Sequence, residues 1–152
     1  MAIGDICSRE VVFARRDTTV KAAAALMRES HIGSIIVVDE PNGKPIPAGI
    51  VTDRDIVVAV VALGLNPDAI QVGDVMSQEL LAVREDAGTA ETVELMRLKG
   101  VRRLPVTDNA GALVGVVAAD DILSLLADEM SALATMVSRE RKHEKKTRRS
   151  RT

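Results

Sequence analysis

The segment GIVTDRDI, residues 49–56, predicts a buried strand that runs directly into a helix. The pattern returns as GVVAADDI at residues 115–122, an offset of 66. Nearer the N-terminus the offset is 69, because IGDICS at 3–8 matches VGDVMS at 72–77. The three-residue difference falls in EPNGKPIPA, residues 40–48, a Pro- and Gly-rich turn where insertions cost little. The chain is therefore predicted to contain two homologous units of roughly 65 residues each.

The two units share one predicted order of elements: a helix, two strands and a closing helix. We expect these at 18–30, 34–38, 48–51 and 53–63, then at 88–99, 103–107, 113–117 and from 119 onward. Asp17 or Thr18 is the expected N-cap of the first helix, and the last helix is expected to continue past Ser138. An isolated unit of this size would bury little core, so the two should pack together through their sheets.

The composition favours an α/β core and excludes several classes of protein. Of 152 residues, 47% are hydrophobic, almost all aliphatic, with one Phe and neither Trp nor Tyr, so base stacking on aromatic side chains is not expected. Cys7 is the single cysteine, and His31 and His143 lack metal-ligand or catalytic spacing, so we expect neither a metal site nor catalytic residues. No apolar stretch approaches about 20 residues and no signal peptide is evident, so we expect a cytoplasmic protein without membrane contact.

Charge is distributed unevenly along the chain. Residues 139–152 contain eight Lys or Arg and two Glu, a balance of +6, whereas the preceding 138 residues contain 12 basic and 20 acidic groups, a balance of −8. The basic tail is compatible with a solvated helix end, a contact for an anionic partner or a nucleic-acid arm. The sequence leaves these three open.

Six short motifs in register resemble a tandem pair of cystathionine β-synthase (CBS) domains, often called a Bateman module. They are the lead-ins GDICS and GDVMS, the segments ALMRESHIGSIIVVD and ELMRLKGVRRLPVTD, and the exits GIVTDRDI and GVVAADDI. The resemblance covers residues 3–126. It implies an α/β (α+β) fold of two β-α-β-β-α units packed through their sheets, and a homodimer of such pairs. We therefore expect one unit at 1–66, a second at 67–126, and a helical extension with the basic tail at 127–152.

The same resemblance implies a function. CBS pairs bind adenosine-containing ligands in the clefts between their units, including AMP, ADP, ATP, S-adenosylmethionine and NAD-type dinucleotides. Their usual role is regulatory sensing rather than catalysis, with the signal passed to an effector protein that this sequence does not identify.

Three interpretations compete for the motif that follows the first exit strand. Thr52 could cap the helix, where a hydroxyl satisfies free backbone amides. Asp53 and Asp55 could form a metal pair for phosphoryl transfer, although no P-loop or matching nucleophile is present. In the family, a Thr-x-x-Asp at this place binds ribose, so Asp55 would accept hydrogen bonds from the sugar hydroxyls and Thr52 would reach the sugar or α-phosphate. Capping is compatible with the ribose interpretation.

The resemblance assigns two unequal clefts, because Ala118 replaces Thr52 at the second exit while Asp121 keeps the carboxylate. In the family, each cleft combines one unit's exit with the other unit's strand start. The first cleft would then be lined by Thr52, Asp55, Arg102, Arg103, Leu80, Leu81, Val101 and Pro105. The second would be lined by Asp121, Ala118, Val11, Val12, Ile32, Gly33 and Ser34. Strand alternation lets only one of the two arginines point into a cleft. The first cleft is expected to bind the nucleotide better.

These observations predict a regulatory CBS pair that senses an adenine nucleotide and changes conformation or partner binding. The alternative is a nucleic-acid-associated protein that acts through its basic tail and uses the CBS pair as a dimerisation scaffold. Nucleic acid is therefore possible as a partner but is not favoured.

Overall fold

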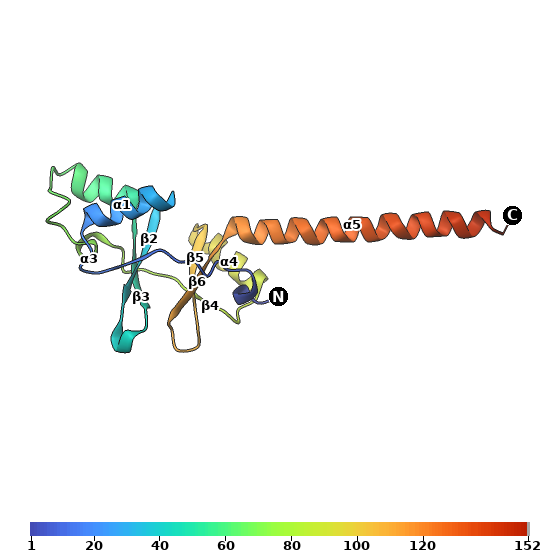
Figure 1. Cartoon of the computed structure of the whole chain (residues 1–152), viewed down its shortest axis with the longest axis horizontal. Helices are drawn as coiled ribbons and strands as arrows, with labels where there is room; N and C mark the ends of the chain where they lie inside the picture. Colours follow the sequence, from blue (N-terminus) through green and yellow to red (C-terminus); the bar gives the residue numbers. More distant parts are fainter. Residues whose placement is uncertain (152) are drawn as a thin grey trace.

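The computed structural model of the chain describes residues 1–151 and contains two three-stranded sheets, each covered by helices (Figure 1). In each sheet the middle strand pairs parallel with the first strand and antiparallel with the third. The strands of the first sheet are β1 (Phe13–Arg15), β2 (Ser34–Asp39) and β3 (Ile46–Thr52). Those of the second are β4 (Val83–Arg84), β5 (Arg103–Thr107) and β6 (Leu113–Ala118). This mixed architecture confirms the predicted fold class.

The helices follow the repeat as well. They are α1 (Val20–Ser30), α2 (Asp53–Ile56) with the π-helix η3 (Val57–Val61), α3 (Val72–Val75), α4 (Thr89–Lys99) and α5 (Ala119–Arg149). Two short 3₁₀ turns, Ile3–Asp5 and Pro41–Gly43, complete the described elements. The cap of α1 differs from the prediction: Thr19 accepts the hydrogen bond from the Ala22 amide, while the Thr18 hydroxyl accepts one from the Arg15 amide. α4 ends as expected at Gly100, which adopts φ 65°.

Each unit has its own core, and a third cluster joins the two sheets. The first core contains Ile35, Val37 and Val51 of its sheet, and the second contains Leu104 and Val117 of its own. The joining cluster brings Ile36 and Val38 of β2 against Leu113 of β6, with partly buried Val11, Phe13 and Val116 around them. The Leu113 amide also donates to the Pro45 carbonyl at 2.7 Å. The two units therefore pack through their sheets, as the sequence predicts.

The two lead-in segments are exchanged between the units. Residues 3–8 begin the first unit in the sequence, yet Ser8 pairs with Val116 of β6 and Ile3 lies in the second core. Residues 72–77 make the reciprocal contacts, because Ser77 pairs with Ile50 of β3 and both Val72 and Met76 lie in the first core. Each half of the chain thus completes the core of the other. This exchange couples the folding of the two units.

Two glycines allow the lead-ins to approach the sheets. A Cβ atom at Gly49 would lie 2.6 Å from the Ser77 carbonyl oxygen, and one at Gly115 would lie 2.7 Å from Cys7 Sγ and 2.8 Å from the Ser8 carbonyl oxygen. Both strands therefore need glycine at these positions, which are equivalent in the repeat.

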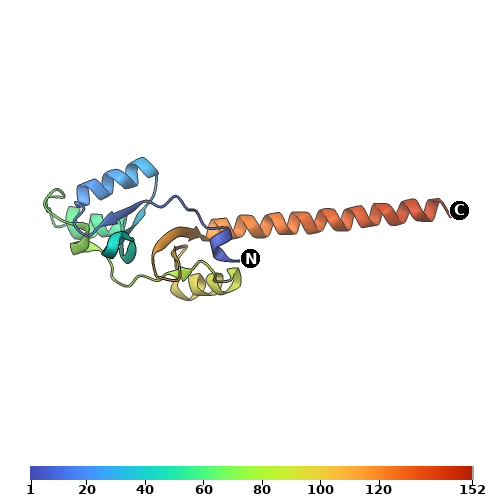
Figure 2. The same ribbon diagram turned by 60° about the horizontal axis from the view of Figure 1, so that its bottom comes forward.

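The last helix leaves the body of the protein. α5 begins where β6 ends and extends to Arg149 as a single straight rod, far beyond both sheets (Figures 1 and 2). The prediction that this helix continues past Ser138 into the basic tail is confirmed. Within residues 1–151, no helix combines the length and apolar character that crossing a membrane requires.

Candidate functional site

A cavity of about 360 Å³ lies between the two units, and the strand faces that meet there determine its walls. Ile36 of β2 stands opposite Ile50 of β3, and Pro105 of β5 stands opposite Val116 of β6. Because side chains alternate along a strand, Ser34 shares the face of Ile36 and Arg103 shares that of Pro105. The lining is Ser8, Glu10, Val11, Val12, Ile32, Ser34, Ile36, Ile50, Arg103, Pro105, Val116, Ala118, Asp120 and Asp121.

Comparison of equivalent positions in the repeat shows that the cavity lies beside the start of α5 and not beside the start of α2. Three pairs of equivalent positions line it together: Ser34 with Arg103, Ile36 with Pro105, and Ile50 with Val116. These residues form the shared centre of the two units. The other lining residues have repeat counterparts that do not line this cavity, and those counterparts include Thr52, Asp55, Leu80, Leu81 and Val101. The cavity therefore lies on the side of the second exit motif.

Six of the seven residues predicted for the second cleft line this cavity: Val11, Val12, Ile32, Ser34, Ala118 and Asp121. The seventh, Gly33, lies at the start of β2, where its carbonyl accepts a hydrogen bond from the Asp53 amide at 2.9 Å. The structure thus brings together residues from both units that lie more than 80 positions apart in the sequence.

The residues predicted for the first cleft are distributed differently. Arg103 and Pro105 line the cavity on the Asp121 side, whereas we expected them beside Thr52 and Asp55. Arg102 instead forms an ion pair with Asp120 at 3.1 Å. This division agrees with strand alternation, because consecutive residues at the start of β5 point to opposite faces. Leu81 and Val101 pack against the second core, and Leu80, which precedes Leu81, is half-buried.

Thr52 and Asp55 form a reciprocal cap at the start of α2. The Thr52 hydroxyl accepts a hydrogen bond from the Asp55 amide at 3.1 Å, and the Thr52 amide donates to Asp55 Oδ2 at 2.9 Å. The capping interpretation of this motif is therefore realised. At α5 the corresponding cap is half complete, since the Ala118 amide donates to Asp121 Oδ2 at 3.0 Å but Ala118 has no hydroxyl to return the bond.

The polar groups around the cavity can position a ligand. Asp121 is held at the start of α5 by its bond to the Ala118 amide, which fixes the direction of its carboxylate. Glu10, Asp120 and Asp121 contribute three carboxylates to the lining, and Arg103 contributes one guanidinium. The cavity is thus acidic, with apolar walls. Two carboxyl groups have a lowered pKa, Asp39 through its hydrogen bond with Arg16 and Glu94 through that with Arg97, and neither lines the cavity.

Several lining residues were not predicted from the sequence: Ser8, Glu10, Ile36, Ile50, Val116 and Asp120. Strand alternation could have identified Ile36 from Ser34 and Val116 from Ala118, two positions away in each case. No local sequence pattern predicts that Ser8 and Glu10 line the cavity, because their position depends on the packing of the first lead-in against the second unit. Among residues 1–151, no group of three or more His, Cys, Asp and Glu side chains is placed to hold a metal ion.

Comparison with known proteins places both units in one family. The model of the CBS domain matches residues 3–62 and again residues 72–128. Protein MK0525 of Methanopyrus kandleri is 42% identical over 125 residues, which are 82% of this chain and 62% of that protein. The CBS domain-containing protein YhcV of Bacillus subtilis is 32% identical over 121 residues, 80% of this chain and 82% of YhcV. This chain therefore spans less than two thirds of MK0525 but most of YhcV.

Solved structures agree with the sequence comparison. The CBS domain pair of protein MJ0100, in complex with 5′-methylthioadenosine and S-adenosyl-L-methionine, superposes with a TM-score of 0.68 at 25% identity. The match covers 83% of this chain and 99% of that one.

Proposed function

Because this chain belongs to the CBS domain family as a tandem pair of its units, we propose that it is a regulatory protein whose cavity binds an adenosine-containing ligand. The observation that carries the proposal is a cavity of about 360 Å³ walled by apolar side chains of both units and lined by the Asp121 carboxylate. Small-molecule sites commonly have volumes of about 300–1,000 Å³ and combine apolar walls with a few placed polar groups.

The lining residues suggest a role for each part of an adenosine ligand. Val12 and Ile32, with the apolar side chains of the strands, would contact the adenine ring. The carboxylate of Asp121, oriented by the Ala118 amide, would accept hydrogen bonds from the ribose hydroxyls. Where the ligand has an anionic group, such as the carboxylate of S-adenosylmethionine or the phosphate of AMP, Arg103 would interact with it. Asp121 of the second exit motif is thereby given the ribose-binding role that the family resemblance implies for the carboxylate at this position.

We place the ligand beside Asp121 rather than beside Thr52 and Asp55, which the sequence favoured. Asp121 lines the cavity together with Arg103, whereas Thr52 and Asp55 do not line it. The carboxylate and the guanidinium that the ligand needs are therefore both present on one side of the pair.

The charge of the cavity favours some adenosine ligands over others. Three carboxylates and one guanidinium line it, and Arg102 pairs with one of those carboxylates, Asp120. The lining therefore keeps a small net negative charge, and the adenosine ligand best matched to it is neutral or positively charged. S-Adenosylmethionine carries a sulfonium cation and methylthioadenosine is neutral, whereas ATP brings several negative charges close to Glu10 and Asp120. We therefore expect affinity to decrease from S-adenosylmethionine and methylthioadenosine through AMP to ATP. The CBS domain pair of MJ0100 is in complex with the first two of these ligands.

Binding in this cavity would be regulatory because the ligand contacts both units. A ligand shifts a protein between two conformations only to the extent that it binds one of them better. A molecule held between Ile32 of the first unit and Asp121 of the second would favour one relative arrangement of the sheets. The exchanged lead-ins and α5, which starts two residues before Asp121, would transmit that arrangement to an effector. The proposed role is binding, with no catalysed reaction.

Calorimetric titration with S-adenosylmethionine, methylthioadenosine, AMP and ATP tests the proposal. Asp121→Asn should weaken the tightest ligand by about tenfold or more, since a charge-assisted hydrogen bond contributes about 1.5–3 kcal/mol. Asp55→Asn is the matched control, because it alters the equivalent helix cap and does not touch the cavity lining. Loss of affinity in Asp55→Asn alone would move the site to the other side of the pair. Failure of all four ligands to bind would refute the proposed function.

A further inference from the structure

Five apolar side chains form a continuous line along α5. The first two, Leu123 and Leu126, border a hollow against α4, and the body of the protein does not cover the other three. Leu123, Leu126, Met130, Leu133 and Val137 follow one another at intervals of three, four, three and four residues. Between 38% and 72% of each side chain is exposed. Alternating intervals of three and four place residues on the a and d positions of a heptad, the seam along which two helices pack in a coiled coil. We call this line the α5 seam.

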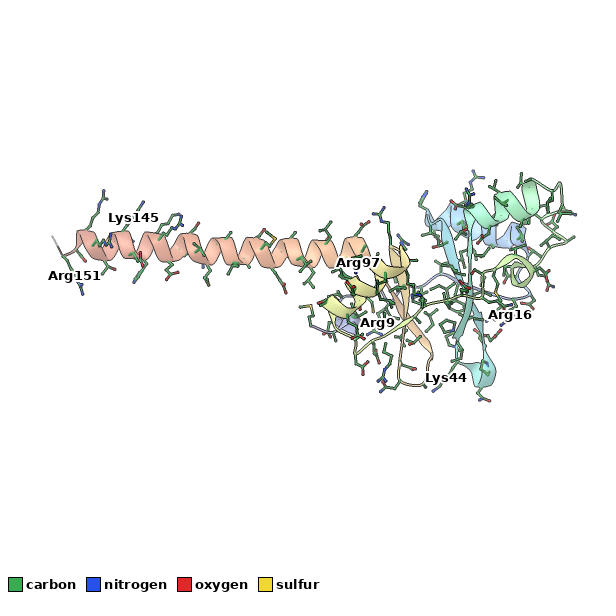
Figure 3. The ribbon with its side chains drawn as sticks, turned by 180° about the vertical axis from the view of Figure 1, so that it is seen from behind. Arg9, Arg16, Lys44, Arg97, Lys145 and Arg151 are labelled. Carbon is green, nitrogen blue, oxygen red and sulfur yellow. The ribbon has the colours of Figure 1, made fainter. Side chains whose placement is uncertain are left out.

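Beyond Leu126 the seam lies on a part of the helix that no other segment of the chain covers. Ile122 is the buried residue of α5, and every residue from 126 to 151 is exposed. Figure 3 shows the rod surrounded by its own side chains only, with Lys145 and Arg151 near its free end and Arg97 on the body. Helices in proteins owe most of their stability to packing of an apolar face. We therefore expect the seam to pack against the surface of another molecule.

Charge along α5 indicates which surface fits. Residues 119–138 contain four carboxylates and no Lys or Arg, whereas residues 139–151 contain eight basic and two acidic side chains. The helix is therefore acidic in its first half and basic at its end. A second α5 in the opposite direction would bring basic segment against acidic half, so the helix is complementary in charge to an inverted copy of itself.

The parallel arrangement is opposed by the same charges. It would set the two basic segments side by side along their whole length. Glu140 and Glu144 continue the spacing of the seam beyond Val137, so a parallel pair would also place each glutamate opposite its own copy. Like charges on facing positions destabilise a helix pair and help to set its orientation.

We propose that α5 pairs antiparallel with α5 of a second copy of this chain along the seam. In an antiparallel pair the a positions face d positions, so Leu126 packs on the partner's Val137 and Met130 on the partner's Leu133. In this register residues 139–143 lie level with residues 120–124 of the other helix. The basic segment then approaches Asp120 and Asp121, which also line the cavity, and assembly adds positive charge to that acidic site.

Disulfide cross-linking tests the pairing and its direction together. Cys7 is the only cysteine, so Cys7→Ser gives a background for two single-cysteine proteins, Leu126→Cys and Val137→Cys. Each protein is oxidised alone and as an equal mixture, and the products are separated under non-reducing conditions. The mixture should yield covalent dimers at least about tenfold faster than either protein alone, because only the antiparallel pair brings 126 and 137 together. Cross-links within each single variant would indicate a parallel pair, and no cross-link would leave the seam to another partner; either result overturns the proposal.

Sedimentation equilibrium of the full chain supplies a second readout. Met130→Glu with Leu133→Glu should weaken association through α5 by about tenfold or more, because it places charges in the seam. Ser131→Glu with Thr135→Glu adds the same charge on the outer face and should leave association within about threefold of wild type. All four side chains are exposed, so neither variant should disturb the cores of the two units. Equal loss of association in both variants, or in neither, would contradict the proposal.

Discussion

Replacement of Ile3 by Ala should destabilise the second unit, although Ile3 belongs to the first unit in the sequence. Ile3 is fully buried and packs in the core that contains Leu104 and Val117. The substitution removes three carbon atoms at about 0.8 kcal/mol each and leaves a cavity, so we expect a loss of about 3 kcal/mol in the free energy of unfolding. That is a large part of the roughly 5–15 kcal/mol that stabilises a typical domain.

Two measurements check this expectation: the change in the free energy of unfolding and the location of the perturbed backbone amides. Urea denaturation gives the free energy of unfolding, and amide chemical shifts show which sheet responds. The shifts should change mainly in β4, β5 and β6. Val72→Ala is the reciprocal variant, since Val72 is fully buried in the first core. It removes two carbon atoms, so it should cost about 2 kcal/mol and perturb mainly β1, β2 and β3.

The exchange of lead-ins would be refuted by the opposite pattern. If Ile3→Ala perturbs the amides of β1–β3 and spares those of β4–β6, the lead-in packs on its own unit. A loss below about 1 kcal/mol would equally contradict the burial of Ile3.

Three further predictions concern local features. Gly115→Ala should cost about 1–3 kcal/mol, because the new methyl group meets Cys7 and Ser8, and an unchanged urea midpoint would contradict this close approach. Ala118→Thr should stabilise the protein by about 1 kcal/mol in thermal denaturation by supplying the missing cap hydroxyl; an unchanged melting temperature would contradict this. The hydrogen bond from Arg16 lowers the pKa of Asp39 in the folded protein. The stability that this interaction contributes is therefore fully present above the unfolded pKa of about 4 and is lost as pH falls through the lowered folded pKa. Asp39→Asn should therefore lower the melting temperature at pH 7 and approach wild type in strong acid, and a constant difference would refute the assignment.

Periodicity and repetition were sufficient to predict the main helices and the longer strands. The expected strands 34–38 and 113–117 correspond to β2 and β6 within one residue. The short strands β1 and β4 contain three and two residues, too few for an alternating pattern to reveal them. The π-helix that continues α2 was also missed, because the run from Val57 to Val61 is apolar throughout and shows no break in composition.

The exchange of lead-ins could not be predicted, and it limited what the sequence could say of the site. GDICS and GDVMS are alike, so either lead-in could pack on either unit without changing any local pattern. The residues that follow the first lead-in, Val11 and Val12, were assigned to the second cleft through the family and do line the cavity with Asp121. Arg103 was assigned to the opposite cleft. Its position in the structure depends on how the two sheets face each other at the shared centre. Local sequence does not encode that relationship directly.

The most direct test of the account is a crystal structure of this chain grown with S-adenosylmethionine. The account predicts electron density for the adenosine group in the cavity between the units, with the ribose hydroxyls on Asp121 and the adenine ring near Val12 and Ile32. Density beside Thr52 and Asp55 instead, or an empty cavity at saturating ligand, would contradict the proposed site.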